Sequence, residues 1–346
     1  MIEILLFFIA ASLLLYVVLG GADYGAGILE LAPQPNLHQK QREVVNYAMG
    51  PVWEANHMWL ILVVVILFMG FPGIFTLVMV HLHLPMVALL VGIVARGTAF
   101  TFRHYDAIHE PKTQRIYSLI FSLSSLWTSF WLGVIGGSLW QGRINPQAKD
   151  FLGAYIEPWT GFVPFTTGIF TVTIFAYLAS VYLVGETKDP ELKKYFWRRG
   201  YLFNIAVILT GGLVFLSAFF DGEEFLISFL RNPVSIGCVM VASLLFILQW
   251  QLLRRNQPLL GRLTAAAQVS LIILGWYFAI APAALMTPQG PISFYDAAAP
   301  EATLRQLTYA LCVGSILIFP SLLYLLKVFK LSGKSLQGDP TKNDGI

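Results

Sequence analysis

Two apolar stretches of the sequence each contain an acidic side chain that a membrane helix would ordinarily exclude. In GGADYGAGILEL, Gly20 to Leu31, the acid is Asp23, and in GPVWEANHMWLIL, which starts at Gly50, it is Glu54. A charged group inside a membrane span costs several kcal/mol and usually faces a bundle interior or a water path. Because a carboxyl group held away from bulk water can exchange protons near neutral pH, both stretches indicate proton transfer.

The spacing around the first acid predicts how its helix packs. Asp23, Gly27 and Glu30 stand at i, i+4 and i+7 and therefore share one helix face. Gly21 and Gly25 form a G-x-x-x-G step, which lets another helix approach closely. Asp23 is thus predicted to lie at a helix contact, with Glu30 as its neighbour.

The spacing around the second acid gathers several polar groups. Glu54 precedes His57 by three residues and Met58 by four, and Trp53 precedes His57 by four. These intervals place an acid, an imidazole and an indole on one stripe of a helix, with Asn56 beside them. We therefore expect Glu54 to take part in a proton path.

A third stretch, ARGTAFTFRHY, supplies the opposite charge through Arg96 and Arg103. Asp23 and Glu30 could form ion pairs with these arginines that lock helix packing, or they could carry protons, and pairing does not exclude proton traffic. Both interpretations stay open at this point.

The histidines raise the question of haem ligation. His81 and His83 fall in the outer half of an apolar segment, whereas His57 lies nearer the other membrane surface. They are not at one level as an axial pair would be, so haem or metal ligation by this chain is disfavoured.

Membrane helices must position all of these residues. The chain is 57% hydrophobic and 12% charged, whereas ordinary soluble domains carry about 25% charged residues. No segment alternates like a barrel strand, so the expected class is all-α: a polytopic membrane protein whose residues 1–346 form a single integral membrane domain. About nine segments are long enough to cross ~30 Å of hydrocarbon, namely Ile4–Leu31, Pro51–Gly70, Gly73–Gly97, Ile116–Gln141, Phe162–Val184, Tyr201–Phe220, Pro233–Leu253, Leu263–Leu285 and Leu307–Phe329.

The distribution of basic residues predicts the orientation. Of the 22 Lys and Arg residues, 18 fall in alternate loops on one side, and only Arg143, Lys149, Arg231 and Arg305 fall on the other. Basic loops remain in the cytoplasm, which places the amino terminus outside and the carboxyl terminus inside a bacterial cytoplasmic membrane.

The motifs resemble one family in their order and spacing. GGADYGAG, GPVWEANHMWLI and ARGTAFTFR are similar to the G-F-D-x-G-x-G, G-P-x-W-D-x-N-x-x-W-L and R-x-x-A-F-x-[FY]-R motifs of subunit II of cytochrome bd-type quinol oxidases. The resemblance continues in YDAAAPEATLRQLTYA near the carboxyl terminus and spans most of the chain.

Four positions depart from the family pattern. Ala22 replaces a usual Phe, Glu54 a usual Asp, Ala55 a common Gly, and Thr101 a frequent acid. The change from Asp to Glu keeps the titratable group and lengthens its reach. Such changes are typical of a divergent branch, of which the cyanide-insensitive type is one, and the sequence leaves cyanide sensitivity open.

The resemblance implies a heterodimer in which subunit I carries haem b, haem d and the site of quinol oxidation, while this chain ligates no cofactor. The complex would oxidise quinol and reduce dioxygen to water with protons from the cytoplasm. The complex is expected to be surrounded by membrane lipid, and nucleic acid is not an expected partner. The sequence does not distinguish ubiquinol from menaquinol as the substrate. It also leaves open whether the complex contains a small single-helix subunit or a structural quinone.

The resemblance also implies roles for particular residues. Asp23 and Glu54 would lie along a proton route from the cytoplasm toward the oxygen-reducing haem at the subunit interface. The residues expected at the interface or in support of the route are Trp53, Asn56, His57, Trp59, Arg96 and Arg103.

Two other functions compete with this one. A proton-coupled secondary transporter would suit nine helices with membrane acids, but it should show an inverted repeat and broken helices at mid-membrane, and the sequence indicates neither. A stand-alone haem b cytochrome would need better-placed ligands.

Overall fold

The computed structural model describes residues 1–32, 36–50, 53–105, 110–221, 224–255 and 257–332. Within these residues, eight helices are long and apolar enough to cross a membrane. A further long helix, α14, corresponds to the ninth predicted span. The predicted all-α class is confirmed, and the predicted number of about nine membrane-spanning helices is close to the number observed.

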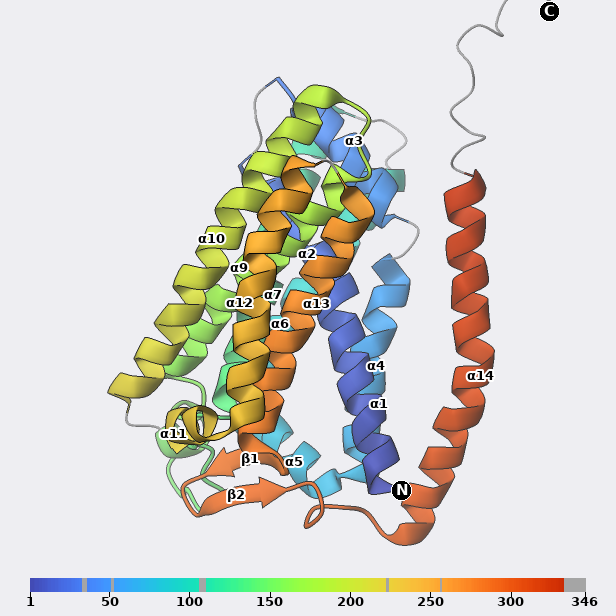
Figure 1. The fold of residues 1–346 in the computed structure, drawn as a ribbon. Coiled ribbons are helices and arrows are strands. Elements are labelled where there is room, and N and C mark those ends of the chain that lie inside the picture. Colours follow the sequence, from blue (N-terminus) through green and yellow to red (C-terminus); the bar gives the residue numbers. More distant parts are fainter. Residues whose placement is uncertain (33–35, 51–52, 106–109, 222–223, 256, 333–346) are drawn as a thin grey trace, which may run out of the picture.

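The elements follow one another along the chain as a series of helices with one hairpin (Figure 1). They are α1 (Ile2–Leu15), η1 (Tyr16–Gly20), α2 (Gly21–Leu29), α3 (His38–Met49), α4 (Trp53–Gly70), α5 (Pro72–His81), α6 (His83–Tyr105), α7 (Pro111–Ser138) and α8 (Phe151–Tyr155). There follow α9 (Phe162–Val184), α10 (Pro190–Phe220), α11 (Glu224–Arg231), α12 (Pro233–Arg254), α13 (Pro258–Ile280), β1 (Ala283–Thr287), β2 (Gly290–Ser293) and α14 (Glu301–Ser332).

Helix α9 lies at the centre of the bundle. It packs against α2 and α7 on one side and against α10 and α13 on the other. A side chain at Gly25 would overlap the backbone carbonyl of Phe175 in α9, and one at Gly21 would meet the Phe175 ring. The close approach predicted from the G-x-x-x-G step is thus confirmed, and it joins the amino-terminal and carboxyl-terminal helices.

The first span, α1 to α2, is continuous but not uniform. Residues Tyr16–Gly20 form one turn of π-helix, in which the extra residue shifts the phase of the side chains that follow. Asp23 and Glu30 therefore point in directions set partly by this turn.

The third predicted span, Gly73–Gly97, was expected as one helix and is instead two. Helix α5 ends at His81, Leu82 leaves the helical region at φ −109° and ψ 20°, and α6 begins at His83. The cause is Pro85, which has no N–H to donate to the His81 carbonyl and so cannot continue the earlier helix.

The eighth predicted span was expected to reach Leu285, but α13 ends at Ile280 because Pro282 follows. The chain then forms an antiparallel hairpin, β1 with β2, in which Leu285 is paired with Ile292. Gly290 has φ +121°, a value that favours glycine, at the turn. The hairpin lies at the same end of the bundle as the amino terminus (Figure 1).

The two ends of the bundle differ in their elements (Figure 1). One end carries α3, the start of α10 and the junction of α12 with α13, and it corresponds to the basic side predicted as cytoplasmic. Helix α14 starts at the opposite end, where Ala299 donates to the Gly70 carbonyl at 2.8 Å. It then stands apart from the bundle, with exposed Tyr309, Ile316 and Tyr324 along it.

Candidate functional site

A buried ion pair joins the first and third spans. The Arg96 Nη2 lies 2.6 Å from Asp23 Oδ1, and both side chains are at most 2% exposed. The contact is an ion pair without hydrogen-bond geometry, and neither carboxylate oxygen of Asp23 accepts a hydrogen bond from a described residue. Arg96 instead donates to the Asp23 backbone carbonyl at 3.3 Å and to Ser125 Oγ at 3.2 Å. The pairing of Asp23 with an arginine, one of the two interpretations left open by the sequence, is present in the structure.

A second buried pair lies nearer the α3 end. Arg103 Nη1 donates to Glu30 Oε2 at 2.9 Å, and Arg103 also donates to Asn46 of α3. Arg42 of α3 donates to Gln114 at the start of α7. Partial burial, and then the positive charge of Arg103, lower the pKa of Arg42 below the ordinary arginine value. Helix α3 therefore covers this pair and brings a further positive charge beside it.

Two tyrosines and a histidine form the next layer, and the two tyrosines are not among the residues predicted from the sequence. Tyr24 Oη lies 3.5 Å from His57 Nδ1, and Tyr16 donates its hydroxyl to Tyr24 at 3.3 Å. The Arg96 guanidinium lies 4.7 Å above the Tyr24 ring, and Tyr24 stacks on Phe175. A hydroxyl, a second hydroxyl and an imidazole in contact can pass a proton along their hydrogen bonds.

The polar layers line up along one helix. Glu30, Asp23, Tyr24 and Tyr16 all lie on the continuous helix from α2 back into η1. At ~1.5 Å per residue, the distance from Glu30 to Tyr16 is about 20 Å, more than half of a hydrocarbon core. The sequence signal that could have identified Tyr24 is its position directly after Asp23.

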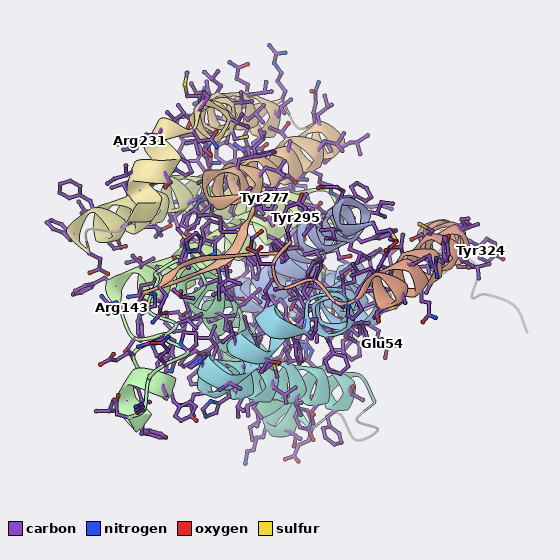
Figure 2. All side chains as sticks on the ribbon, turned by 90° about the horizontal axis from the view of Figure 1, so that it is seen from below. Glu54, Arg143, Arg231, Tyr277, Tyr295 and Tyr324 are labelled. Atoms are coloured by element: carbon purple, nitrogen blue, oxygen red, sulfur yellow. The ribbon has the colours of Figure 1, made fainter. Side chains whose placement is uncertain are left out.

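Glu54 has a different environment from the other acids. It lies on the exposed face of α4, and it forms no hydrogen bond or ion pair with the residues that the structure describes. Figure 2 shows it at the edge of the bundle, on the side from which α14 projects. Met58, one turn further along, is 51% exposed on the same face. Glu54 is therefore available to a group outside this chain.

The expected stripe of Glu54 with His57 does not form a contact. His57 turns inward to Tyr24, while its ring also meets Trp53 edge-on with 6.2 Å between ring centres. Trp53 is half-buried against Phe100. The imidazole therefore belongs to the buried tyrosine layer, and the carboxyl group belongs to the surface.

Asn56 and Trp59, which were expected at the interface or in support of the route, lie inside this chain and not on its outer surface. Asn56 is 5% exposed and Trp59 is 8% exposed within this chain. The reason is that α4 packs against α1 and η1 through Asn56, Trp59 and Val63, and Asn56 lies beside Gly20. The outward face of α4 carries Glu54 and Met58 instead.

The histidines that were considered as haem ligands do not form an axial pair. His57 contacts Tyr24, the buried His81 bonds the Ala154 carbonyl through Nδ1, and His83 bonds the Val80 carbonyl. Each faces a different part of the chain. These residues do not fit a haem held between two imidazoles.

Comparisons with known proteins agree on one family. A family model described as cytochrome bd terminal oxidase subunit II matches residues 1–329. The cytochrome bd ubiquinol oxidase subunit 2 of Bacillus subtilis (strain 168) is 27% identical over 159 residues, which cover 43% of this chain and 46%, about half, of that relative. The putative cytochrome bd menaquinol oxidase subunit II of the same strain is 22% identical over 326 residues, or 91% of each chain.

A solved structure supports the fold. The structure of the bd oxidase from Geobacillus thermodenitrificans aligns with a TM-score of 0.72 and 19% identity, covering 94% of this chain and 98% of that chain. At this identity the likeness shows the fold alone.

Proposed function

This chain belongs to the cytochrome bd terminal oxidase subunit II family, and on that premise we propose that it is the second subunit of a membrane quinol oxidase. The complex takes electrons from quinol and reduces dioxygen to water: two quinols and one dioxygen give two quinones and two water molecules. The family implies a partner subunit I and haems in the complex.

We assign the haems to the partner subunit. The three histidines His57, His81 and His83 are held by contacts with Tyr24 and with backbone carbonyls, so they offer no axial pair. Haem b and haem d supply the electron transfer and the oxygen chemistry, and this chain supplies support and proton access.

The same charge distribution that motivated the orientation supports a cytoplasmic location for the α3 end. A topology reporter fused after Lys342 should read as cytoplasmic, and one inserted after Gln147 as external. The opposite result at either site would reject this orientation.

The proton route is proposed to enter this chain at Glu54. Asp23 and Glu30 each have a guanidinium within 2.9 Å, so proton uptake by either would break an ion pair. Glu54 has no partner among the described residues and lies on the outward face of α4. It can change its protonation state without disturbing the packing of this chain, which is what a proton-transfer group needs.

The buried pairs are proposed to support this route. The Arg96 and Arg103 charges hold Asp23 and Glu30 in place, and Arg96 also orients the Tyr24 ring whose hydroxyl contacts His57. Trp53, directly before Glu54, and His57, one turn after it, pack together and so position the first turn of α4. Asp23 thus acts as a positioning residue of the route, and Glu54 as its proton carrier.

The function is tested by expression with and without subunit I. The chain alone should purify without a haem spectrum, and the co-expressed pair should show haem bands and consume oxygen with quinol as donor. A haem spectrum from the chain alone would contradict the assignment of the haems.

The role of Glu54 is tested in the assembled pair. Glu54→Gln should keep the full haem content and lose most of the oxygen consumption, because Gln cannot release a proton, whereas Glu54→Asp should keep much of it. The matched control is Glu43→Gln, which removes an exposed acid of α3 and should leave the rate unchanged. Wild-type respiration in Glu54→Gln would make Glu54 structural.

A further inference from the structure

A groove opens between α10 and α12 at the α3 end of the bundle, far along the chain from the Glu54 site. It has a volume of about 400 Å³ and is lined by Val184, Lys193, Lys194, Trp197, Leu253 and Arg254. Helix α10 packs mainly on α9, and α12 mainly on α13, which leaves a seam between α10 and α12. Both the start of α10 and the end of α12 lie at this seam.

The basic side chains of the groove are not neutralised by this chain. Lys193, Lys194 and Arg254 form no ion pair with the residues that the structure describes. Two of the three nearby acids are already occupied, since Asp189 accepts from Lys40 at 2.6 Å and Glu186 accepts from Arg262 at 2.7 Å. The third, Glu191, is exposed and does not line the groove, whose lining has three basic side chains and no acid. The groove therefore carries an excess of positive charge.

An aromatic ladder leads from the groove along the membrane-facing surface. Trp197 stacks on Tyr201 with 6.0 Å between ring centres, and Tyr201 lies 4.7 Å from Trp250 of α12. The Trp250 indole is fixed by a 2.7 Å hydrogen bond to Asn204. Tyr and Trp at this depth mark the level of lipid head groups.

Apolar side chains continue the surface below the ladder. Ile205 and Ile208 of α10 and Ile247 of α12 are each at least 38% exposed. They follow the Trp197–Tyr201 and Trp250–Arg254 stripes at helical spacing toward the middle of the membrane. The seam thus has a basic upper part, an aromatic middle and an apolar lower part, which is the order of groups in a phospholipid.

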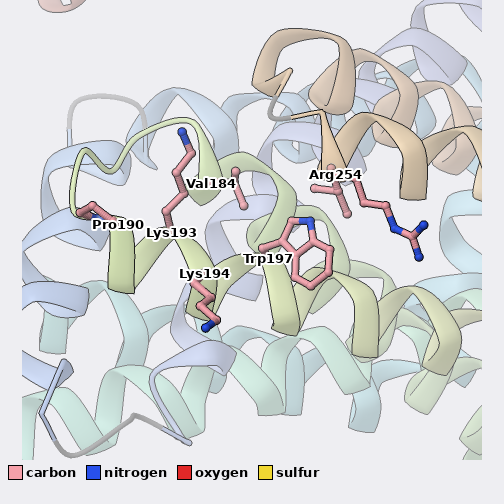
Figure 3. A pocket seen from close by; sticks show the side chains of 7 residues that line it. Val184, Pro190, Lys193, Lys194, Trp197 and Arg254 are labelled. Atoms are coloured by element: carbon pink, nitrogen blue, oxygen red, sulfur yellow. The ribbon is translucent and has the colours of Figure 1, made fainter.

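We propose that this groove binds an anionic phospholipid, with its phosphate on the basic side chains and its acyl chains along the α10–α12 seam. Basic pockets between helices on the cytoplasmic side are suited to such head groups. Figure 3 shows that Lys193 and Lys194 project to opposite sides and that Arg254 lies beyond the Trp197 indole. Because the charges are spread out, a lipid with two phosphates, diphosphatidylglycerol, binds more tightly than phosphatidylglycerol.

The test is lipid binding to the purified, delipidated complex, measured by native mass spectrometry with diphosphatidylglycerol, phosphatidylglycerol and phosphatidylcholine. The wild type should bind diphosphatidylglycerol most tightly. At about fivefold per basic residue, the triple variant K193Q/K194Q/R254Q should bind it on the order of 100-fold more weakly.

The matched control is R198Q/R255Q/K112Q, which removes three exposed basic residues outside the groove and changes the net charge equally. It should bind within about threefold of the wild type, since these three side chains lie at the same end of the bundle but do not line the groove. Equal binding by the triple variant and the wild type would overturn the site, as would an equal loss in the control. Unchanged haem spectra in both variants show that the complex is intact. Inorganic phosphate should not compete, and competition by it would overturn the lipid as the occupant.

Discussion

The two halves of the bundle bury polar groups of different kinds. In the amino-terminal half, α1 to α7, the buried groups include two ion pairs, Asp23 with Arg96 and Glu30 with Arg103, beside neutral amides such as Gln41 and Asn56. In the carboxyl-terminal half, α9 to α13, the buried polar side chains of the described residues are all neutral, and they are amides and hydroxyls. Asn204, Gln249 and Gln268 are all 0% exposed there, Tyr177 donates to Gln268, and Trp250 donates to Asn204.

The two kinds of buried group have different roles, because neutral amides only hold helices together whereas buried charges also influence proton transfer. Neutral amides hold helices together through hydrogen bonds of modest strength and do not gain or lose protons near neutral pH. Buried charges are retained only when they are paired, and they create a field that acts on nearby titratable groups. The titratable groups Glu54 and His57 both lie in the charged half, which is why the proton route is assigned to that half.

The largest effect that separates the halves is expected from Arg96→Gln. This change leaves the Asp23 carboxylate buried without its partner, which costs about 3–5 kcal/mol. The complex should lose haem on purification and unfold at a lower temperature. In Asp23→Asn/Arg96→Gln, where both charges are gone, most of the stability should return. If the single variant were as stable as the wild type, the ion pair would have no structural role.

A smaller effect is expected in the neutral half from Tyr177→Phe. The change removes the hydroxyl that donates to Gln268 and leaves that amide oxygen unpaired, at about 1–3 kcal/mol. Thermal unfolding should report this loss, while oxygen consumption per haem stays at the wild-type value. A large fall in turnover without loss of haem would mean that proton transfer also depends on the carboxyl-terminal half.

The smallest effect is expected at the surface pair of Lys40 with Asp189, which joins α3 to the start of α10. The Lys40 ammonium lowers the pKa of Asp189 below its ordinary 3.8, and Asp189 raises the pKa of Lys40 above its ordinary 10.5. The stabilisation is thus fully present above pH 3.8 and below pH 10.5, and it is lost beyond the shifted pKa values.

Lys40→Gln should therefore lower the unfolding temperature slightly at neutral pH. The difference from the wild type should vanish in strong acid and shrink with added salt, because an exposed pair is screened. A difference that persists in strong acid would mean that Lys40 acts through packing and not through its charge.

The sequence predicted the membrane class, and it offered the pairing of acids with arginines as one of two interpretations, because both follow from the high cost of charge in hydrocarbon. It did not predict the inward faces of Asn56 and Trp59, since α4 is apolar on all sides and its pattern does not mark one face. The Tyr16–Tyr24–His57 contacts depend on the π-helical turn, and no clear sequence pattern predicts such a turn. Pro85 and Pro282 were available signals for the α5–α6 break and the end of α13.

The central claim is that Glu54 carries protons into the complex from the cytoplasmic side. The most direct measurement is proton uptake during a single turnover with dioxygen, followed with a pH-sensitive dye on that side of liposomes holding the complex. In Glu54→Gln, uptake should be about 100-fold slower than in the wild type, while the haem content and the rate of oxygen binding are unchanged. Uptake at the wild-type rate would contradict the account and assign the proton route to the partner subunit alone.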